Sequence, residues 1–235
     1  ENIVVYNSKH SKAFFLTKDA TNYIGNTVSV SATTGLSALT TTAIFPSYPA
    51  GNNGVLQNFD IEGSDFVGVI FMGNTAYSKL FFVDVSASSP VISSGTDLMH
   101  TSMKFLFDIF QTFTWVKPSD PNKRYLFYFG MSNPEMHTYL YELDMNTKVP
   151  TFKAGSIQSG YTLCAPAVDN LNGQDYIYTM LLGSQVIVSG IMDFSIAVIK
   201  VSEFIAQQAN TPSTSLGDIT TGTIGRKVGL GSTYF

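Results

Sequence analysis

The hydrophobic residues of this chain fall into two patterns that are both typical of β-strands. Residues 65–72 (DFVGVIFM) and 175–182 (DYIYTMLL) are mostly apolar or aromatic, as in strands that are buried on both faces. Residues 195–202 (SIAVIKVS) instead alternate with a period of two. Residues 173–203 therefore predict a strand, a hairpin and a second strand.

The same order of parts occurs earlier in the chain, at residues 63–86 and 122–144. Val85, Leu143 and Val201 occupy equivalent places and are spaced 58 residues apart. This spacing predicts a repeat protein with a single all-β domain over residues 1–235. The predicted units cover approximately residues 1–54, 55–111, 112–161 and 162–235.

Each predicted unit contains a first strand, a tight turn, an apolar second strand, a polar hairpin, an alternating third strand and a more variable fourth strand. The predicted strands are residues 2–6, 13–17, 23–31 and 38–45; 55–61, 65–72, 79–86 and a weaker one near 91–94; 112–116, 124–129 and 138–144; and 162–169, 175–182 and 195–202. Residues 98–111 fit either a short helix or a long bent strand. Residues 207–215 (QQANTPSTS) predict a polar connection.

Units of four up-and-down strands that repeat at intervals of about 50–58 residues resemble the blades of a β-propeller. The resemblance implies a propeller-like all-β fold of about four blades, each with four antiparallel strands. The GH…WD pattern of WD40 repeats and the paired glycines of kelch repeats are absent, so no propeller family is indicated. A β-sandwich or a stacked β-sheet array is the alternative fold.

Two closures of such a ring are open. The units could form a compact four-bladed ring in which residues 228–235 (VGLGSTYF) pair onto the first blade. They could equally form part of a larger ring, because the chain begins at Glu1 without an initiator Met and we expect either a processed form or a fragment.

The amino-acid composition also predicts where the protein is located. Only 13% of the residues are charged, whereas the chain contains 25 Ser, 24 Thr, 18 Phe and 12 Tyr. This balance favours strands and predicts an extracellular or cell-surface protein. The single cysteine, Cys164, leaves no internal disulfide framework.

Charge and motifs exclude several classes of function. The net charge of −4 without a Lys/Arg cluster argues against nucleic-acid binding. The longest apolar runs fall short of the roughly 20 residues of a transmembrane helix, so we expect no transmembrane segment. Phosphate loops, nucleophile elbows, zinc-protease motifs and dinucleotide fingerprints are absent, which favours a protein without a cofactor that is not an enzyme.

One loop carries a possible metal site. Residues 167–175 (AVDNLNGQD) resemble the Asp/Asn-rich calcium loops of integrin-type propeller repeats. The resemblance implies oxygen ligands from Asp169, Asn170, Asn172 and Asp175. Calcium loops need alternate residues to point inward, and Leu171 and Gly173 break that alternation. Asn172-Gly173 instead predicts a type I′ hairpin turn, and we favour that interpretation over metal binding.

Aromatic and acidic residues supply the other candidates for a binding site. Tyr139 and Tyr141 share one face of a predicted strand, with Leu140 on the other face; they fit either the core or an exposed platform for sugar stacking. Asp60 and Asp169 lie in predicted first strands, where a propeller enzyme would place carboxylates in its central cleft.

Turn residues carry the remaining predictions. His10, His100 and His137 lie in a turn, an ambiguous segment and a hairpin, and we expect them to be exposed without a role. Asp65 and Asp175 each begin a second strand, where we expect the carboxylate to cap the turn through hydrogen bonds to backbone amides.

These patterns favour a non-enzymatic structural or interaction module, such as a self-assembling subunit of a fibre or coat, in which exposed strands pair with other chains. The main alternative is a propeller that binds a glycan or another small ligand. A propeller hydrolase or lyase is the third hypothesis.

Overall fold

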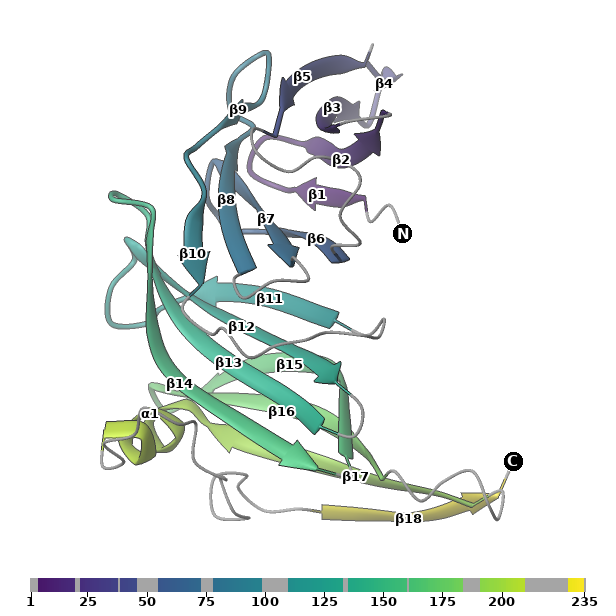
Figure 1. The fold of residues 1–235 in the computed structure, drawn as a ribbon, viewed down its shortest axis with the longest axis vertical. Coiled ribbons are helices and arrows are strands. Elements are labelled where there is room, and N and C mark those ends of the chain that lie inside the picture. The colour runs from purple at the N-terminus through teal and green to yellow at the C-terminus, as the bar shows by residue number, and fades with distance from the viewer. Residues whose placement is uncertain are drawn as a thin grey trace. The chain divides into compact units, whose positions relative to one another are not determined.

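The fold was analysed in a computed structural model of residues 1–235 (Figure 1). The structure describes residues 4–19, 22–37, 39–45, 55–72, 78–98, 110–132, 135–159, 161–183, 191–209 and 228–234. These residues form four antiparallel sheets and one helix, which confirms the all-β fold class. The helix is too short to cross a membrane, and the described residues contain no other.

The chain divides into two compact units, and each is described by itself. The first contains Glu1–Lys104, Phe113–Tyr125 and Leu143–Pro150. The second contains Phe105–Thr112, Leu126–Glu142 and Thr151–Phe235. The expectation of a single domain over the whole chain stays a prediction.

The first sheet follows the predicted meander and adds one short strand. Its strands are β1 (Val5–Asn7), β2 (Lys12–Lys18), β3 (Tyr23–Ser31), β4 (Gly35–Leu36) and β5 (Thr40–Ile44). Strands β1, β2 and β3 pair in order, and β4 and β5 both pair with β3. Strand β3 has the predicted bounds.

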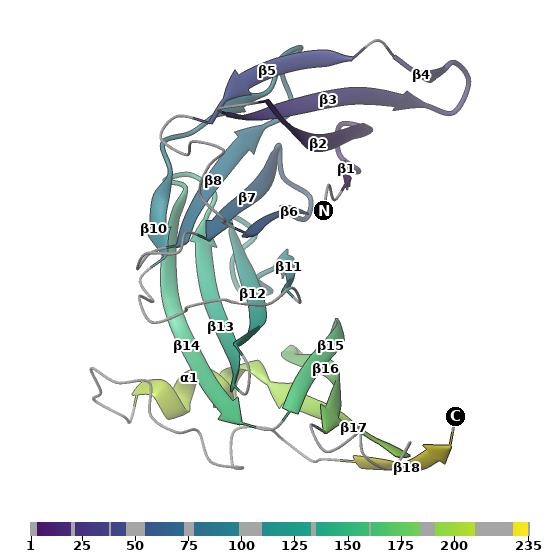
Figure 2. The same cartoon turned by 45° about the vertical axis from the view of Figure 1, so that its right-hand side comes forward.

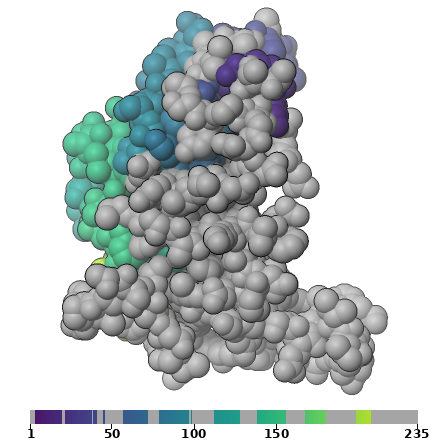
Figure 3. Space-filling model, in the orientation of Figure 1, coloured from purple at the N-terminus to yellow at the C-terminus, as the bar shows by residue number. Residues whose placement is uncertain are grey.

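The second sheet has the same order of strands. It contains β6 (Val55–Asp60), β7 (Phe66–Met72), β8 (Ser78–Asp84), β9 (Val91–Ile92) and β10 (Thr96–Leu98). The predicted weak fourth strand is β9, and β10, which the sequence did not indicate, also pairs with β8. In the space-filling view this sheet forms a continuous blue region of the surface (Figure 3). Most of the ambiguous segment that follows, residues 99–109, lies outside the described residues.

The third and fourth sheets are four-stranded meanders. The third contains β11 (Phe110–Val116), β12 (Lys123–Ser132), β13 (Glu135–Asp144) and β14 (Val149–Ser159). The fourth contains β15 (Tyr161–Leu171), β16 (Gln174–Gly183), β17 (Ile191–Lys200) and β18 (Val228–Tyr234). Because β18 pairs with β17, the prediction that this tail pairs onto the first blade is wrong.

Helix α1 (Val201–Ala209) replaces the predicted end of a strand and the start of a polar connection. In the sequence, the alternating pattern of β17 continues through Val201, so it does not indicate the change from strand to helix. Val201, Phe204 and Ile205 also have helical spacing, and the first two are only 3% and 2% exposed. Burial of this apolar stripe therefore decides the segment in favour of a helix.

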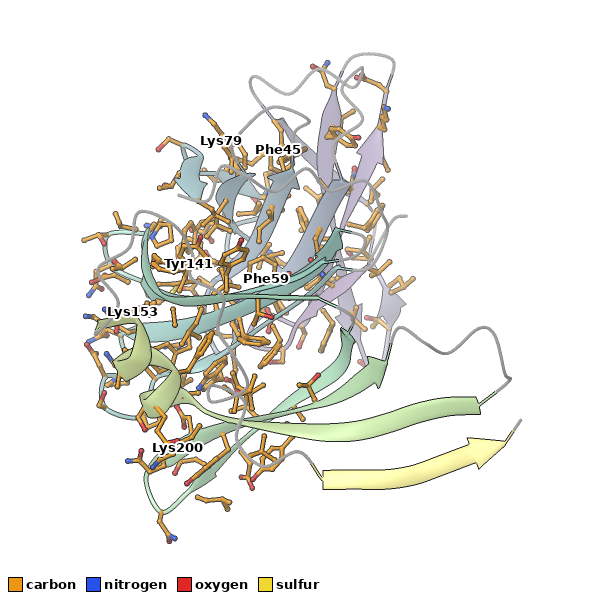
Figure 4. All side chains as sticks on the ribbon, turned by 60° about the horizontal axis from the view of Figure 1, so that its bottom comes forward. Phe45, Phe59, Lys79, Tyr141, Lys153 and Lys200 are labelled. Atoms are coloured by element: carbon orange, nitrogen blue, oxygen red, sulfur yellow. The ribbon has the colours of Figure 1, made fainter. Side chains whose placement is uncertain are left out.

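The core of the first unit lies between its first two sheets. It is lined by Val5, Phe14, Leu16, Phe45, Val67, Val69, Phe71, Phe81, Val83 and Val85. The ring of Phe45, labelled in Figure 4, lies 5.1 Å from that of Phe71 and 5.5 Å from that of Phe81. Consecutive residues of β7, such as Val69 and Ile70, are fully buried. The prediction that this second strand is buried on both faces is thus confirmed.

One glycine is required by the packing of β7 against β6 within the second sheet. Gly68 lies in β7, opposite Phe59 of β6. A Cβ atom at position 68 would lie 2.2 Å from Cζ of Phe59, a ring that is itself buried. The ring therefore occupies the space that any side chain at position 68 would need.

The core of the second unit includes both faces of β13. Tyr139, Leu140 and Tyr141 are at most 1% exposed, and the ring of Tyr141 meets Phe152 edge-on at 5.7 Å. Burial raises the pKa of the Tyr141 hydroxyl far above its ordinary value. The interpretation of these tyrosines as core is confirmed, while a role in ligand binding stays a prediction.

Candidate functional site

The outer edge of the first sheet is formed by β4, Ser37, Leu39 and β5, which together we call the uncharged edge. Figure 2 shows β3 and β4 extending as a hairpin beyond β1 and β2. Leu36 is 71% exposed and Leu39 is 54% exposed, two of the most exposed large apolar side chains among the described residues. This edge therefore presents aliphatic surface to solvent.

Hydroxyl groups and backbone groups hold the hairpin in place. The amide of Ser37 donates to the carbonyl of Ser29 over 3.0 Å, and the amide of Ser29 donates to the Ser37 hydroxyl over 3.0 Å. The amides of Thr33 and Thr34 donate to the hydroxyl of Ser31. Gly35 adopts a φ of 74°, which glycine tolerates at this turn. The hairpin is thus ordered without a charged group.

Charged side chains are absent from a long segment around this edge. The sequence contains no Asp, Glu, Lys, Arg or His between Asp19 and Asp60. Natural sheet edges are usually protected against association by charged residues, particularly lysine, or by proline. The uncharged edge has neither in β4 or β5. This absence of charge is visible in the sequence and could have indicated the edge.

The backbone of the edge is available for pairing. In the described part of the chain, β3 is the only strand that pairs with β4 or β5. The amides of Ser37 and Phe45 donate to carbonyl groups of β3. Because backbone groups alternate in direction along an antiparallel ladder, the amides of Leu36 and Thr41 point away from β3.

The opposite side of the same sheet is fastened by basic residues, which we call the basic clasp: Lys9, His10 and Lys12. The Nζ atom of Lys9 and the Nε2 atom of His10 lie 2.8 and 2.6 Å from Oδ1 of Asp65, which lies in the turn before β7 of the second sheet. The Lys12 ammonium donates to the carbonyl groups of Val85, at 2.7 Å, and Ala87, at 2.5 Å. The clasp therefore ties the first sheet to the second.

Two predictions about these turns are wrong. His10 is not an exposed residue without a role, because it contacts Asp65. Asp65 does not cap its turn, since its carboxylate binds Lys9 and His10 instead of backbone amides; their hydrogen bonds hold its pKa below the ordinary value. His100 and the side chain of His137 lie outside the described residues. The sequence could not indicate these contacts, because they join two units of the repeat.

Asp60 lies at the end of β6 in a network of polar groups from three sheets. Its carboxylate accepts a hydrogen bond of 2.9 Å from Nδ2 of Asn7, which also donates to the carbonyl of Ser64. Its carbonyl accepts a hydrogen bond from the hydroxyl of Thr114. Burial raises the pKa of Asp60, the Asn7 hydrogen bond partly offsets that effect, and Glu62 raises the pKa further. These contacts hold neighbouring strands together.

Arg124 completes this network from the third sheet. It is 7% exposed, and Nε donates to the carbonyl of Glu62 over 2.6 Å. Nη1 donates to the carbonyls of Pro121 and Lys123. The carboxylate of Glu62 accepts a hydrogen bond of 3.0 Å from the amide of Val116. The charges in this region therefore anchor turns of the backbone.

The predicted hairpin at Asn172-Gly173 is confirmed. Both residues have positive φ, 54° and 75°, as a type I′ turn requires, and Leu171 pairs with Gln174 across it. Asp169 is exposed, whereas Asp175 is buried and accepts a hydrogen bond of 2.7 Å from Nδ2 of Asn170. Among the described residues, no group of three His, Cys, Asp or Glu side chains is positioned to hold a metal ion.

Asp60 belongs to the first unit and Asp169 to the second. Each therefore lies in a different local environment, Asp60 in the network with Asn7 and Asp169 at an exposed hairpin. Their pairing as catalytic carboxylates stays a prediction.

Comparison with known proteins identifies no family. No protein-family model matches the chain, and no curated protein matches it. Seven solved chains match it in structure. One, from a structural and mechanistic study of two prolyl endopeptidases, has a TM-score of 0.41 and 9% identity, covering 86% of this chain and 33% of the other. The chain thus spans about a third of that chain's length, and a likeness at this level assigns neither family nor activity.

Proposed function

We propose that this chain is a non-enzymatic structural module that associates with other copies of itself. The observation that carries the proposal is the uncharged edge, which combines an open strand, exposed leucines and the absence of charge. Such an edge is a template for pairing with another strand.

The distribution of charge supports this proposal over an enzyme. In the first unit, Lys9, Lys12 and Arg124 are engaged with carboxylate or carbonyl groups of neighbouring strands. Asp60, the acidic candidate in this unit, accepts a hydrogen bond from Asn7 within the same network. These charged groups have structural partners within the chain. The exposed leucines of the edge, by contrast, have no use in a monomer.

The finer architecture and the location are also proposals. Four consecutive up-and-down sheets support a propeller-like array of blades, since each sheet needs neighbours to cover its faces. The low charge and the abundance of Ser and Thr support an extracellular or cell-surface location. A module of this kind would serve as a subunit of a larger coat, fibre or complex.

The test is the native mass of the particle, measured by light scattering after size exclusion over a range of protein concentrations. We expect species heavier than the 25.6 kDa chain, with a population that grows with concentration. A mass of one chain at every concentration would overturn the proposed function. Glycan-binding and hydrolase assays would then become the next experiments.

A further inference from the structure

We infer that the partner on the uncharged edge is a second copy of the same edge, paired antiparallel about a two-fold axis. This inference rests on the proposed function and names its contact. It predicts that this contact joins two copies only, because an isologous contact uses the same surface of both copies; any larger assembly would use other surfaces of the chain.

The uncharged edge can accept a further strand. Strand β3 occupies one side of β4 and β5, and the amides of Leu36 and Thr41 are directed to the other side. Strand β9 lies near β5, but it pairs with β8. A strand added alongside β5 would therefore continue the ladder of the first sheet.

The lack of charge makes a second copy of this edge a suitable partner strand. In an antiparallel pair related by a two-fold axis, residues near the axis lie opposite their own copies. Any charged residue there would face the same charge, which destabilises a cross-strand pair. The segment between Asp19 and Asp60 contains no such residue, so this edge meets the requirement for pairing with itself.

The exposed apolar surface of the edge also favours pairing. Leu36 and Leu39 lie on either side of Ser37 in this edge and remain largely in solvent. Pairing with a second copy would cover Leu36 and Leu39 of both chains. An edge of charged or polar side chains would gain nothing comparable from that contact.

A charge added at the edge tests the inference directly. We expect Leu36→Lys to weaken dimerisation about tenfold or more, because a hydrated charge replaces an apolar side chain that the contact would cover. Leu171→Lys is the matched control: Leu171 is also an exposed leucine beside a hairpin turn, at 46%, and the substitution adds the same charge. Thr41→Pro, which removes an outward amide, should weaken the dimer without breaking a bond to β3.

Cysteine scanning tests the symmetry. In a Cys164→Ser background, which lacks any other thiol, single cysteines are placed in turn at positions 35–44 and oxidised. Antiparallel two-fold pairing predicts a disulfide-linked dimer only at the positions next to the axis. Cross-links at every second position would instead indicate parallel, in-register strands, and would overturn the inference. Leu171→Cys controls for chance collisions and should not cross-link.

The possible failures are distinguishable. If the unsubstituted chain is monomeric at every concentration, the proposed function and this inference both fail. If it associates and both Leu36→Lys and Thr41→Pro associate equally well, the inference alone is wrong and the contact lies elsewhere. Folding of each variant is checked by circular dichroism, and the two variants act by different means, so misfolding of one leaves the other as a test.

Discussion

The first sheet meets its surroundings in two opposite ways. On one side, the basic clasp binds Asp65 and the carbonyl groups after β8. On the other side, the uncharged edge leaves backbone groups and leucines open to solvent. One sheet thus combines a side that is committed to a specific neighbour with a side that is not. In the first sheet, charged side chains fix one side to its neighbour, and the side without charged residues is open.

The largest effect should come from disturbing the packing inside the second sheet, the neighbour to which the first sheet is committed. Gly68→Ala places a methyl group in the space of the Phe59 ring, and we expect a loss of about 3 kcal/mol in the free energy of unfolding. Urea denaturation measures this loss. In a Phe59→Leu background the same substitution should cost less, and equal costs in both backgrounds would show that the two residues are not coupled.

Next in size is the loss of the buried guanidinium. Arg124→Met removes the donors to the carbonyls of Glu62, Pro121 and Lys123, and we expect a loss of about 2 kcal/mol. Arg124→Lys keeps the charge but not the fork of donors, so it should restore only part of the stability. Lys200→Met, at an exposed pair with Glu203, is the control and should change stability far less. An unchanged denaturation midpoint in Arg124→Met would contradict this view of the network.

A smaller effect should appear in the dependence of stability on pH. The pKa of Asp65 is below its ordinary value of 3.8 in the folded protein, so its contribution is present above pH 3.8 and is lost as the pH falls through the folded pKa. The contribution is at most about 1 kcal/mol, because the carboxylate is 40% exposed and solvent screens it.

The contribution of Asp60 to stability should depend on pH in the opposite direction. Its folded pKa is above 3.8, so its stabilising contribution is present below pH 3.8 and is lost as the pH rises through the folded value. Urea denaturation between pH 3 and 7 should therefore show that Asp65→Asn flattens the acid side of the stability curve, whereas Asp60→Asn steepens it. Parallel curves for the two variants would argue against the contrast.

The smallest effect on stability should come from the open side. Leu36→Lys alters an exposed side chain, and we expect the free energy of unfolding of the monomer to change by no more than about 0.5 kcal/mol. Thermal unfolding at a concentration that keeps the chain monomeric measures it. A large loss would mean that Leu36 belongs to the fold and would weaken the contrast between the two sides.

The strands and the repeat could be predicted because they depend on local patterns. The bounds of β3, the apolar run of β7 and the turn at Asn172-Gly173 each follow from side-chain alternation or from turn chemistry within a few residues. Helix α1 could not be separated from β17, because alternating and helical spacings overlap at Val201.

The site was harder to predict because it depends on contacts between neighbouring sheets. Nothing local indicates that His10 lies 2.6 Å from Asp65, or that Asn7 donates to Asp60, since these pairs are brought together by the stacking of sheets. The uncharged edge is different, because its composition is visible in the sequence. What the sequence lacks is the strand order, which shows that β4 and β5 are on the outside of the sheet.

The uncharged segment also determines which chemical tools can detect this edge. Neither lysine nor arginine occurs between Lys18 and Lys79, so trypsin has no cleavage site there and amine-reactive cross-linkers have no point of attachment. Lysine-directed mapping of an assembly would therefore report contacts near the basic clasp and remain silent about the uncharged edge. Chymotrypsin, which accepts leucine, would instead cleave after Leu36 and Leu39 in the free chain, and these sites would be protected when the edge is covered.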